Sequence, residues 1–415
     1  MAVPSWRRPQ AAAAEPEQER ERTDMDFHHT KEELEFIEEF RDWLSDNFTG
    51  EFLTIKGVGG VCDDTHWDLR LEWEKLLARD RWLNLSWPVE YGGRGGTYAQ
   101  EVLFQLEHAR ADAPYWLGSQ GRDLFGPTLL SYGKDEHKAR FLPKIAAAEE
   151  FWGQGFSEPE AGSDLANLRT RAELDGDEWV INGQKIWTTF GTHADWLYVL
   201  CKTDPTAPRH KAISMLLVPV DQPGVDVRAI RNISGGREFA EVFFTDARTK
   251  ADLVVGPVNG GWGVVMGTLG NERGGTTVIP FQASFHREMR DALAVARSRG
   301  LDRDPLWRQR LAKAWGDLRV LDLLIQRNLT PLLRGGHPGA ESSILKIYWS
   351  FWHREMGELR MDLVGADANV LADGELSLAQ RVFLDARAET IYGGSAEVQR
   401  NIIGERVLGL PKEPS

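Results

Sequence analysis

The sequence has little cysteine and no long apolar run. Its two cysteines, Cys62 and Cys201, are too few for a disulfide framework or a cysteine-based zinc site, and such usage is typical of a reducing compartment. A membrane span needs about 18 consecutive apolar residues. Ile213–Val220, among the longest runs here, has the length of a buried strand. We therefore expect a cytoplasmic protein with no membrane association.

Positive charge is also scarce, and familiar ligand motifs are missing. Lys and Arg number 49 against 63 Asp and Glu, which gives a net charge of −14 and argues against nucleic acid as a partner. The 10 histidines include no pair at metal-ligand spacing, because the adjacent His28 and His29 have diverging side chains. No phosphate-binding loop, Rossmann glycine pattern, HExxH or GxSxG occurs. We expect no metal site.

What the chain does have is enough apolar material for several cores. It is 415 residues long and 42% hydrophobic, so two or three domains are expected. Residues 1–24 stand apart, because charge follows Ala11–Ala14 directly and leaves no apolar stretch of a secretory signal. We predict a disordered tail over 1–24; alternatively Met25 is the true start.

An N-terminal helical domain is predicted over residues 25–150. Thr30 and Glu33 have the spacing of a capping box, and Phe36, Phe40 and Leu44 follow at helical spacing. Helix-length segments continue to about residue 148, interrupted by a turn-rich loop around Trp87.

A central β domain is predicted over residues 151–256. Two β-rich runs flank Asn182-Gly183, the strongest short hairpin signal, so the sequence predicts a hairpin there. Further β-rich runs cover Trp196–Cys201, Ile213–Val220 and Glu241–Phe244.

A C-terminal helical bundle is predicted over residues 257–415. The two apolar faces expected in it are Leu311, Trp315, Leu318, Leu321 and Ile325, and Ile344, Ile347, Tyr348, Phe351 and Leu359. A third helix, about Leu378–Ile391, ends at Gly393-Gly394 before a last helix from Ala396. The fold class is therefore α+β, with the order helices, sheet, helices.

Three stretches contain residues that suit a bound cofactor or a reaction, each with a structural alternative. Ser157–Asp164 offers backbone N–H groups around a glycine, or is an ordinary polar loop. Trp187-Thr188-Thr189 places an aromatic face beside two hydroxyls, or is core tryptophan with edge threonines. Glu272-Arg273 is either a desolvated base with its arginine or a solvated ion pair.

Six blocks in this order resemble the acyl-CoA dehydrogenase family over about residues 25–411. They are Trp87-Pro-Val-Glu-Tyr-Gly-Gly, Phe141-Leu-Pro-Lys-Ile, Gly155-Phe-Ser-Glu-Pro-Glu-Ala-Gly-Ser-Asp, Asn182-Gly-Gln-Lys-Ile-Trp-Thr-Thr, Gly260-Gly-Trp and Ile391-Tyr-Gly-Gly-Ser-Ala-Glu-Val-Gln-Arg. The resemblance implies a helical N-terminal domain, a β-barrel-like central domain and a C-terminal four-helix bundle.

The same resemblance implies FAD as cofactor and an acyl-CoA thioester as substrate, in lipid metabolism of the fatty-acid β-oxidation type. A base removes the α-proton and the β-hydrogen leaves as hydride to flavin N5, which gives a trans-2-enoyl-CoA. It also implies an electron-transfer flavoprotein as acceptor and a homo-oligomer, dimer or tetramer, or a heterotetramer with a related subunit.

The resemblance assigns the site residues by position. Those matching FAD contacts are Phe156, Ser157, Gly162, Ser163, Trp187, Thr188, Thr189, Ser395 and Glu397. Ser163 also matches a serine near the CoA pyrophosphate, and Arg273, Tyr392 and Gly393 match substrate-side positions, where the Gly393 N–H stabilises enolate charge on the thioester oxygen.

The family places its base in one of two positions. The position after Tyr392 is Gly393, which has no acidic side chain. The other position lies ten residues beyond the aromatic of the glycine-rich turn, and counting from Trp262 gives Glu272. The resemblance therefore implies Glu272 as the α-proton base.

Two departures from the family pattern concern intersubunit FAD contacts. Arg297-Ser-Arg-Gly-Leu replaces an Arg-x-x-Phe-Gly block, and Val364-Gly-Ala-Asp-Ala replaces a glycine-rich turn at the adenine end of FAD. Similar departures occur in members that act on steroid, dicarboxylic or other unusual acyl-CoAs, some of them heteromers. The alternatives are a non-catalytic or half-site subunit of a heteromeric dehydrogenase, and an oxygen-using acyl-CoA oxidase or flavin monooxygenase of the same fold.

Overall fold

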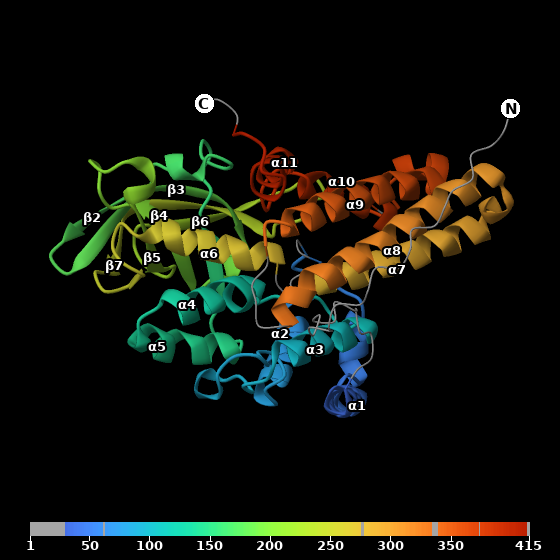
Figure 1. Ribbon diagram of the computed structural model, residues 1–415, viewed down its shortest axis with the longest axis horizontal. Coiled ribbons are helices and arrows are strands. Elements are labelled where there is room, and N and C mark those ends of the chain that lie inside the picture. Colours follow the sequence, from blue (N-terminus) through green and yellow to red (C-terminus); the bar gives the residue numbers. More distant parts are fainter. Residues whose placement is uncertain (1–29, 61–62, 275–277, 334–338, 373, 413–415) are drawn as a thin grey trace, which may run out of the picture.

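Helices, then one sheet, then helices again follow one another along the chain (Figure 1). The computed structural model describes residues 30–60, 63–274, 278–333, 339–372 and 374–412, and the side chains of 271–274 lie outside that description. The predicted α+β class and element order are confirmed. The predicted tail over 1–24 lies outside the described residues, and the boundaries at 150 and 256 stay predictions.

The first helical layer is closed by an aromatic core. Its α-helices are α1 (Lys31–Asn47), α2 (Trp67–Arg79), α3 (Tyr98–Arg110), α4 (Gly126–Tyr132) and α5 (Asp135–Ala146). The predicted capping box is present, since Thr30 Oγ1 accepts from Glu33 N and Thr30 N donates to the Glu33 carboxylate. Phe40 is fully buried with its ring 4.8 Å from that of Phe104.

The middle of the chain forms one eight-stranded sheet, which lies at the left in Figure 1. Its strands are β1 (Trp152–Gly155), β2 (Arg171–Asp175), β3 (Glu178–Thr189), β4 (Trp196–Lys202), β5 (Ile213–Pro219), β6 (Val225–Ile230), β7 (Phe239–Lys250) and β8 (Val254–Val255). The order is β6-β7-β3-β2-β4-β5-β8, with β1 parallel to β4 outside this path. β6 pairs with β7 along its whole length, and no expected run included it.

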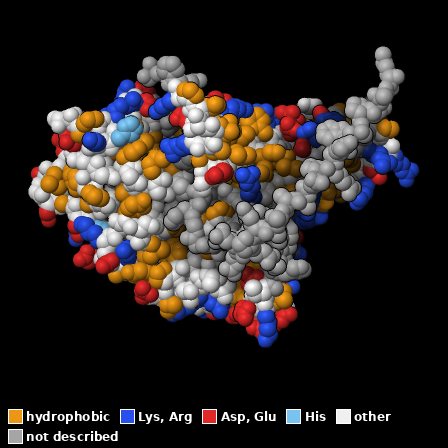
Figure 2. Space-filling model, viewed as in Figure 1, with side chains coloured by type: hydrophobic (Ala, Val, Ile, Leu, Met, Phe, Trp, Pro, Cys, Tyr) orange, Lys and Arg blue, Asp and Glu red, His pale blue; other side chains and the backbone are white. Residues whose placement is uncertain are grey.

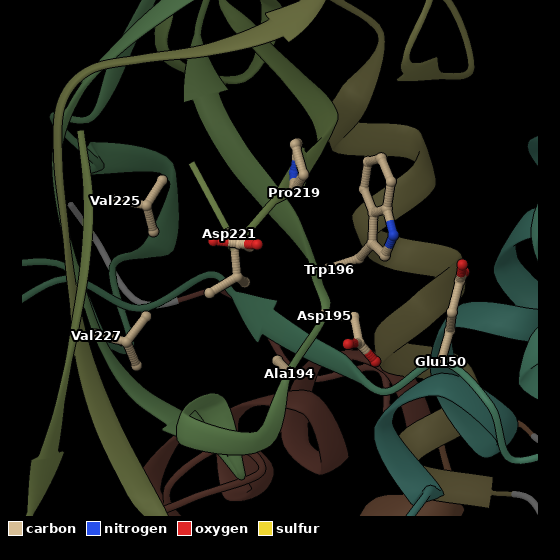
Figure 3. A pocket seen from close by; sticks show the side chains of 9 residues that line it. Glu150, Ala194, Asp195, Trp196, Pro219, Asp221, Val225 and Val227 are labelled. Carbon is tan, nitrogen blue, oxygen red and sulfur yellow. The ribbon is translucent and has the colours of Figure 1, made fainter. Parts of the chain in front are cut away.

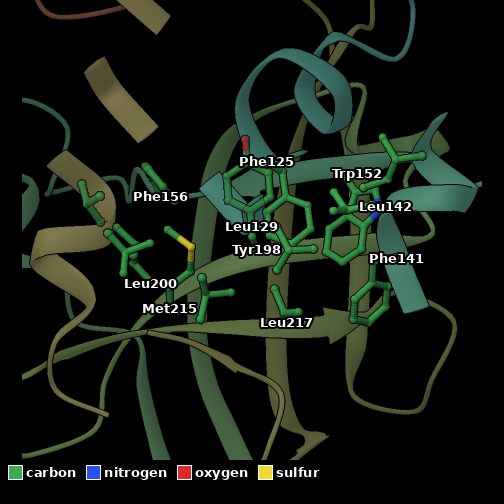
Figure 4. Close-up of a cluster of buried hydrophobic side chains, with 14 of the residues drawn as sticks. Phe125, Leu129, Phe141, Leu142, Trp152, Phe156, Tyr198, Leu200, Met215 and Leu217 are labelled. Atoms are coloured by element: carbon green, nitrogen blue, oxygen red, sulfur yellow. The ribbon is translucent and has the colours of Figure 1, made fainter. Parts of the chain in front are cut away.

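A second aromatic core joins this sheet to the helices before it. Phe125, at the end of a π-helical segment (Gln120–Phe125), stacks on Trp152 of β1 at 4.1 Å and on Tyr198 of β4 at 5.1 Å. Figure 4 shows these rings beside Phe141 and Leu217 in one continuous cluster. The helices and the sheet therefore share a core and pack as one body.

The predicted hairpin at Asn182-Gly183 is wrong. β3 runs straight through both residues, and the turn that precedes it is at Asp175–Glu178, between β2 and β3. Gly183 instead occupies a β-bulge with φ +152°, where an added Cβ would meet Thr170 Oγ1 at 2.5 Å. Asn182 bonds across to Asp246 on β7 through both ends of its amide. Asn182-Gly183 therefore allows two backbone segments to approach closely and does not reverse the chain.

The C-terminal helices form the predicted bundle beside the sheet. They are α6 (Gly261–Gly274), α7 (Val278–Ser298), α8 (Pro305–Leu333), α9 (Ser342–Val364), α10 (Leu378–Glu389) and α11 (Ala396–Ile402). In Figure 1, α7 to α10 run alongside one another, while α6 packs against β5, the π-helical segment, α4 and α9. α6 thus connects all three layers.

The predicted apolar faces of the bundle need correction. On α8 the expected Leu311, Leu318 and Ile325 are buried, but Trp315 is 43% exposed. On α9 the predicted face over Ile344–Phe351 is only half-buried. Leu359, the last residue of the predicted face, is buried as expected. The other buried side chains include Leu345, Trp349, Trp352 and Met356, which were not predicted. Because α9 contacts α7, α8, α10 and α11, most of its surface is covered and a single face cannot be read from spacing.

Within the described residues, no helix is both long and apolar enough to span a bilayer. The same residues contain no group of three or more His, Cys, Asp and Glu side chains that could hold a metal ion.

Candidate functional site

The end of β3 carries an exposed tryptophan in a strained backbone. The register of β3 on β7 shifts between Lys185 and Thr188, which marks a bulge. Within it Trp187 has φ +63° and is 55% exposed, with its ring 5.9 Å from Phe239 in a T-shaped contact. Bulges re-aim side chains, and left-handed non-glycine residues gather at functional sites. The indole ring is therefore presented outward from the sheet.

The two threonines after Trp187 differ in environment. Thr188 is fully buried, and its Oγ1 donates to the Gln154 carbonyl of β1 at 3.2 Å. This bond joins the end of β3 to β1, so the Thr188 hydroxyl is directed into the sheet. Thr189 pairs with Phe239 and is half-buried, which leaves part of its side chain accessible beside Trp187.

The segment after β1 lies against this part of β3. The Ser157 carbonyl accepts from Ile186 N at 2.9 Å, so Phe156 and Ser157 lie alongside the residues that lead to Trp187. The Phe156 ring is buried edge-on against Tyr198, whereas Ser157 is half-buried. The structure thus brings the two predicted FAD-binding segments together.

Farther along the same loop, the predicted contacts are open to solvent. Glu158 and Ala161 exchange two backbone hydrogen bonds, which closes a tight turn. Gly162 and Ser163 follow it and are exposed, and a Cβ on Gly162 would meet nothing within 4 Å. The loop offers space and backbone groups to a ligand at these two residues.

A buried ion pair lies behind this segment, and neither of its residues was among the predicted site residues. Lys185 is fully buried, and its Nζ is 2.8 Å from Glu158 Oε1 and 3.1 Å from the Phe156 carbonyl. Glu158 also accepts from the backbone N–H groups of Arg169 and Thr170. One signal in the sequence could have pointed to Lys185. It is a lysine at an inward position of a strand with alternating burial, in phase with the buried Trp179 and Ile181.

Burial and ion pairing have opposite effects on the pKa values of Glu158 and Lys185. Burial alone raises the pKa of Glu158, but the Lys185 charge and the hydrogen bonds outweigh it and hold that pKa below its usual range. Burial lowers the pKa of Lys185 against the attraction of Glu158. The nearby Cys201 thiol has its pKa raised to about 12 by burial, so this cysteine is an inert core residue.

A second acidic residue that the sequence analysis missed precedes Phe239. Glu238 is 1% exposed; Asn232 donates to its Oε1, while its Oε2 has no protein partner among the described residues. Burial raises the pKa of Glu238 to about 7, and the negative charge of Asp385 on α10 contributes to this increase. Ser234, in the same loop, hydrogen-bonds to Asp385. This loop therefore connects the Trp187 side of the sheet to the bundle.

Tyr392, Gly393 and Ser395 lie in the turn between α10 and α11, and Glu397 lies in the first turn of α11. Gly393 and Gly394 have φ +62° and +86°, and the Gln399 amide donates to both of their carbonyls. Ser395 caps α11 by accepting from Val398 N. Left-handed backbone at two successive positions explains the glycine pair. The hydrogen bonds of Gly393, Gly394 and Ser395 described above stay within the turn and α11.

The side chains around that turn are partly accessible. Glu397 is exposed, and its pKa is lowered by backbone and Ser395 hydrogen bonds. Tyr392 is half-buried, with Lys346 Nζ 5.9 Å from its ring centre. Lys346 is buried and also donates to the Glu389 carbonyl at the end of α10. That bond fixes the helix terminus from which the turn departs.

A buried charged triad includes the last residue of α10, Glu389. His353 of α9 is within 2.7 Å of Glu389 through Nδ1 and within 2.9 Å of Glu288 of α7 through Nε2. Burial alone lowers the pKa of His353, but attraction to both carboxylates outweighs it and holds the pKa well above its usual range. The triad ties α7, α9 and α10 together beneath the Gly393 turn.

The predicted base is placed by its backbone only. Glu272 and Arg273 fall in the last turn of α6, the helix that connects the sheet and the bundle. Their side chains lie outside the described residues, so their roles stay predictions.

One open cavity lies elsewhere. Its volume is about 530 Å³, and Figure 3 shows Glu150, Asp195, Trp196, Asp221 and Val227 among its lining side chains. It contains none of the predicted site residues.

Comparison with known proteins decides the family. Models of the N-terminal, middle and C-terminal domains of acyl-CoA dehydrogenases match residues 30–149, 153–247 and 259–408. This chain belongs to the acyl-CoA dehydrogenase family. It is therefore an oxidoreductase, and its cofactor is FAD.

Relatives within the family give finer comparisons. The acyl-CoA dehydrogenase IpdE1 of Mycobacterium tuberculosis is 47% identical over 381 residues, 91% of this chain and 98% of that protein. Among solved structures, the steroid ACAD Tcur3481–Tcur3483 is 30% identical with a TM-score of 0.81, over 94% of this chain and 100% of the other. The ChsE4–ChsE5 complex of M. tuberculosis is 31% identical with a TM-score of 0.79, over the same shares.

The residues present fit FAD on structural grounds. An exposed indole ring in a strained bulge gives a flat surface for a planar ring system. Beside it, the half-buried Ser157 N–H donates to no protein acceptor among the described residues. A flat apolar face with an adjacent free donor is what a ring with heteroatoms along one edge requires.

Proposed function

We propose that this dehydrogenase oxidises an acyl-CoA thioester to the trans-2-enoyl-CoA at the end of β3. The observation that carries the proposal is the junction of the Phe156–Ser157 segment with the Trp187–Thr189 bulge. In it, Trp187 supplies the stacking face, and Ser157, Thr189 and the exposed Gly162 and Ser163 supply polar contacts. Bound FAD supplies the hydride acceptor, N5 of its flavin.

Glu272 takes the α-proton in this proposal. Its support is the ten-residue spacing from Trp262 and the backbone position of Glu272 on α6, between the sheet and the bundle. Loss of the α-proton to the carboxylate and of the β-hydrogen with its electron pair forms the new double bond. The Gly393 N–H is assigned to the developing charge on the thioester oxygen, and Arg273 to orienting the site.

The substrate class we propose is a bulky, polycyclic acyl-CoA. Two observations support it. Gly393 has no side chain at the position where other family members carry their base, so the space beside the reacting carbons is wider. The word steroid also stands in the name of one structural relative. We therefore favour a steroidal thioester over the straight fatty acyl chain that the resemblance alone implied.

We further propose that the working enzyme is an oligomer, with a heteromer of two related subunits as the favoured form. Two of the structural relatives are named as pairs of different subunits. Large apolar side chains are exposed at both ends of α10 and in the segment after α11, and Figure 2 shows hydrophobic side chains over α9 and α10. They include Leu378, Ile391, Leu408 and Leu410. Such exposure is typical of an interaction surface.

The deciding experiment is a visible spectrum of the purified chain, followed by anaerobic addition of straight-chain, branched and steroidal acyl-CoAs. We expect bleaching of the flavin band by a steroidal thioester, at a rate well above that for straight chains. Bleaching by straight-chain thioesters alone would overturn the substrate class. A colourless protein that turns yellow only with a partner subunit would establish the half-site alternative.

Glu272→Gln tests the base separately. This variant keeps the size of the side chain and removes its basicity, so FAD should stay bound while reduction by substrate falls by about 10²-fold or more. Glu355→Gln, an exposed position on α9, is the matched control and should leave reduction unchanged. Normal reduction in Glu272→Gln would remove Glu272 from the proposal.

A further inference from the structure

We infer that Lys185 is a positioning residue for FAD: its buried ammonium holds the Phe156 carbonyl inward and thereby aims the Ser157 N–H at the edge of the flavin. The inference rests on the proposed function, in which the 156–157 segment lines that edge. It adds a residue that touches neither substrate nor cofactor.

The first observation is the geometry around the ammonium. Lys185 Nζ is fully buried, 3.1 Å from the Phe156 carbonyl oxygen and 2.8 Å from Glu158 Oε1. An ammonium is a strong donor, and a charge-assisted bond inside a protein holds its acceptor more firmly than a neutral one. The orientation of the Phe156 carbonyl is therefore fixed from inside the sheet.

The second observation is the peptide unit that this carbonyl belongs to. Among the described residues there is no cis peptide bond, so the Phe156 C=O and the Ser157 N–H point in opposite directions. With the oxygen turned toward Lys185, the N–H is turned away from it, out of the buried pair. Ser157 is half-buried and its N–H has no protein acceptor in the described part of the chain. The donor is thus directed outward and left for a ligand.

The third observation is where Lys185 stands along β3. Trp187 follows two residues later, and the intervening Ile186 N–H donates to the Ser157 carbonyl at 2.9 Å. Thr188 Oγ1 then donates to the Gln154 carbonyl at 3.2 Å. Lys185, Ile186 and Thr188 of β3 therefore fasten β1 and the two residues that follow its end. Lys185 alone of the three holds the peptide whose N–H is free.

Glu158 has a separable role. It accepts from Arg169 N and Thr170 N and balances the charge of Lys185, but it makes no bond to the Phe156–Ser157 peptide. Replacing Glu158 by Gln removes the anion and leaves the bond from Lys185 to the Phe156 carbonyl in place. A role in general stability predicts equal consequences for both residues, whereas a positioning role predicts unequal ones.

The test is FAD binding by the full chain. Apoprotein of wild type, Lys185→Met, Glu158→Gln and the charge-neutral double variant Lys185→Met/Glu158→Gln is titrated with FAD, and the visible spectrum of each complex is recorded. Glu107→Gln is the matched control, since Glu107 is a buried carboxylate bonded to Arg41 and Arg110 on the helices before the sheet. The double variant keeps the test valid if Lys185→Met does not fold, because it leaves no unpaired buried charge.

We expect Lys185→Met and the double variant to bind FAD about 10-fold more weakly or worse, with a shifted flavin band, from loss of one oriented donor. Glu158→Gln and Glu107→Gln should stay within about 3-fold of wild type, although both lose stability. Wild-type affinity in the double variant, or equal losses in Glu158→Gln and Lys185→Met, would overturn the inference.

Trp187→Ala separates this inference from the proposed function. If Trp187→Ala weakens FAD binding while the Lys185 variants do not, the site is correct and the positioning role is wrong. If FAD binds normally to Trp187→Ala as well, the cofactor lies elsewhere and the proposed site itself fails.

Discussion

The sheet side and the bundle side of the candidate site are both supported by buried charge, but the two clusters differ in composition. Behind the sheet segment, one lysine faces one carboxylate, Glu158. Beneath the Gly393 turn, one histidine, His353, lies between two carboxylates, Glu288 and Glu389. In the Lys185–Glu158 pair each charge has one partner of opposite charge, whereas in the triad His353 has two.

This difference bears on how each side responds to change. Removing one member of an isolated buried pair leaves an uncompensated charge, which is strongly destabilising. Removing one acid from the triad leaves the histidine still paired. The cation also differs, because a histidine can lose its charge within the physiological range and a lysine ordinarily keeps it. The sheet side is therefore sensitive to substitution, and the bundle side to pH.

Lys185→Met should have the largest effect on stability. It leaves Glu158 buried without its cation, so we expect the free energy of unfolding to fall by about 3–5 kcal/mol. Denaturant unfolding of the apoprotein measures this. The double variant with Glu158→Gln should recover part of the loss, because the stranded charge is gone. A loss below about 1 kcal/mol in Lys185→Met would mean that the pair is solvated and that the comparison fails.

His353→Gln should follow, with a loss of about 3 kcal/mol. It removes the cation and leaves two buried carboxylates, Glu288 and Glu389, on either side of a neutral amide. Arg360, which donates to the Glu288 carbonyl, limits the damage on the α7 side. Unfolding of this variant beside Lys185→Met compares the two clusters directly, and a loss larger than that of Lys185→Met would reverse their ranking.

The pH dependence of stability should separate the clusters further. The pKa of His353 is held well above its usual value in the folded chain, by Glu389 and Glu288 against the effect of burial. His353 also attracts the carboxylate of Asp385. Protonation therefore favours the folded state: its contribution is complete below the unfolded pKa of about 6.5 and is lost as pH rises through the raised pKa.

The measurement is unfolding free energy at a series of pH values above 6 for wild type and His353→Gln. Wild type should lose stability toward alkaline pH, and the variant should lose less. Parallel curves for the two proteins would show that the triad does not titrate in this range.

Patterns local in the sequence predicted much of the fold. The capping box at Thr30, the α–β–α order and the break at Gly393-Gly394 depend on neighbours within a few residues, and the structure has all three. The hairpin at Asn182-Gly183 was wrong because the same dipeptide suits a turn and a bulge. Only the distant Thr170 and Asp246, which contact it, decide between them.

The sequence predicted the segments that line the candidate site but not the buried charged residues that support them. Phe156–Ser157 and Trp187–Thr189 were named from blocks of sequence, and the structure places them side by side. Their buried partners could not be found in the same way, because 27 residues separate Lys185 from Glu158 and 65 separate His353 from Glu288. No spacing rule connects charges that far apart, and 63 acidic residues offer too many candidates.

The smallest expected effect is that of Glu389→Gln, and it is the sharpest test of the second carboxylate that His353 contacts. His353 would keep Glu288 at 2.9 Å, while the new amide can still accept through its oxygen, so the loss should be about 1 kcal/mol. Glu158→Gln is the matched change in the pair and should lose about 3 kcal/mol, because Lys185 then has only carbonyl-type acceptors. Unfolding of the two variants under identical conditions gives the difference. Equal losses would mean that both acids of the triad are needed to hold His353, and that the number of partners does not distinguish the two sides of the site.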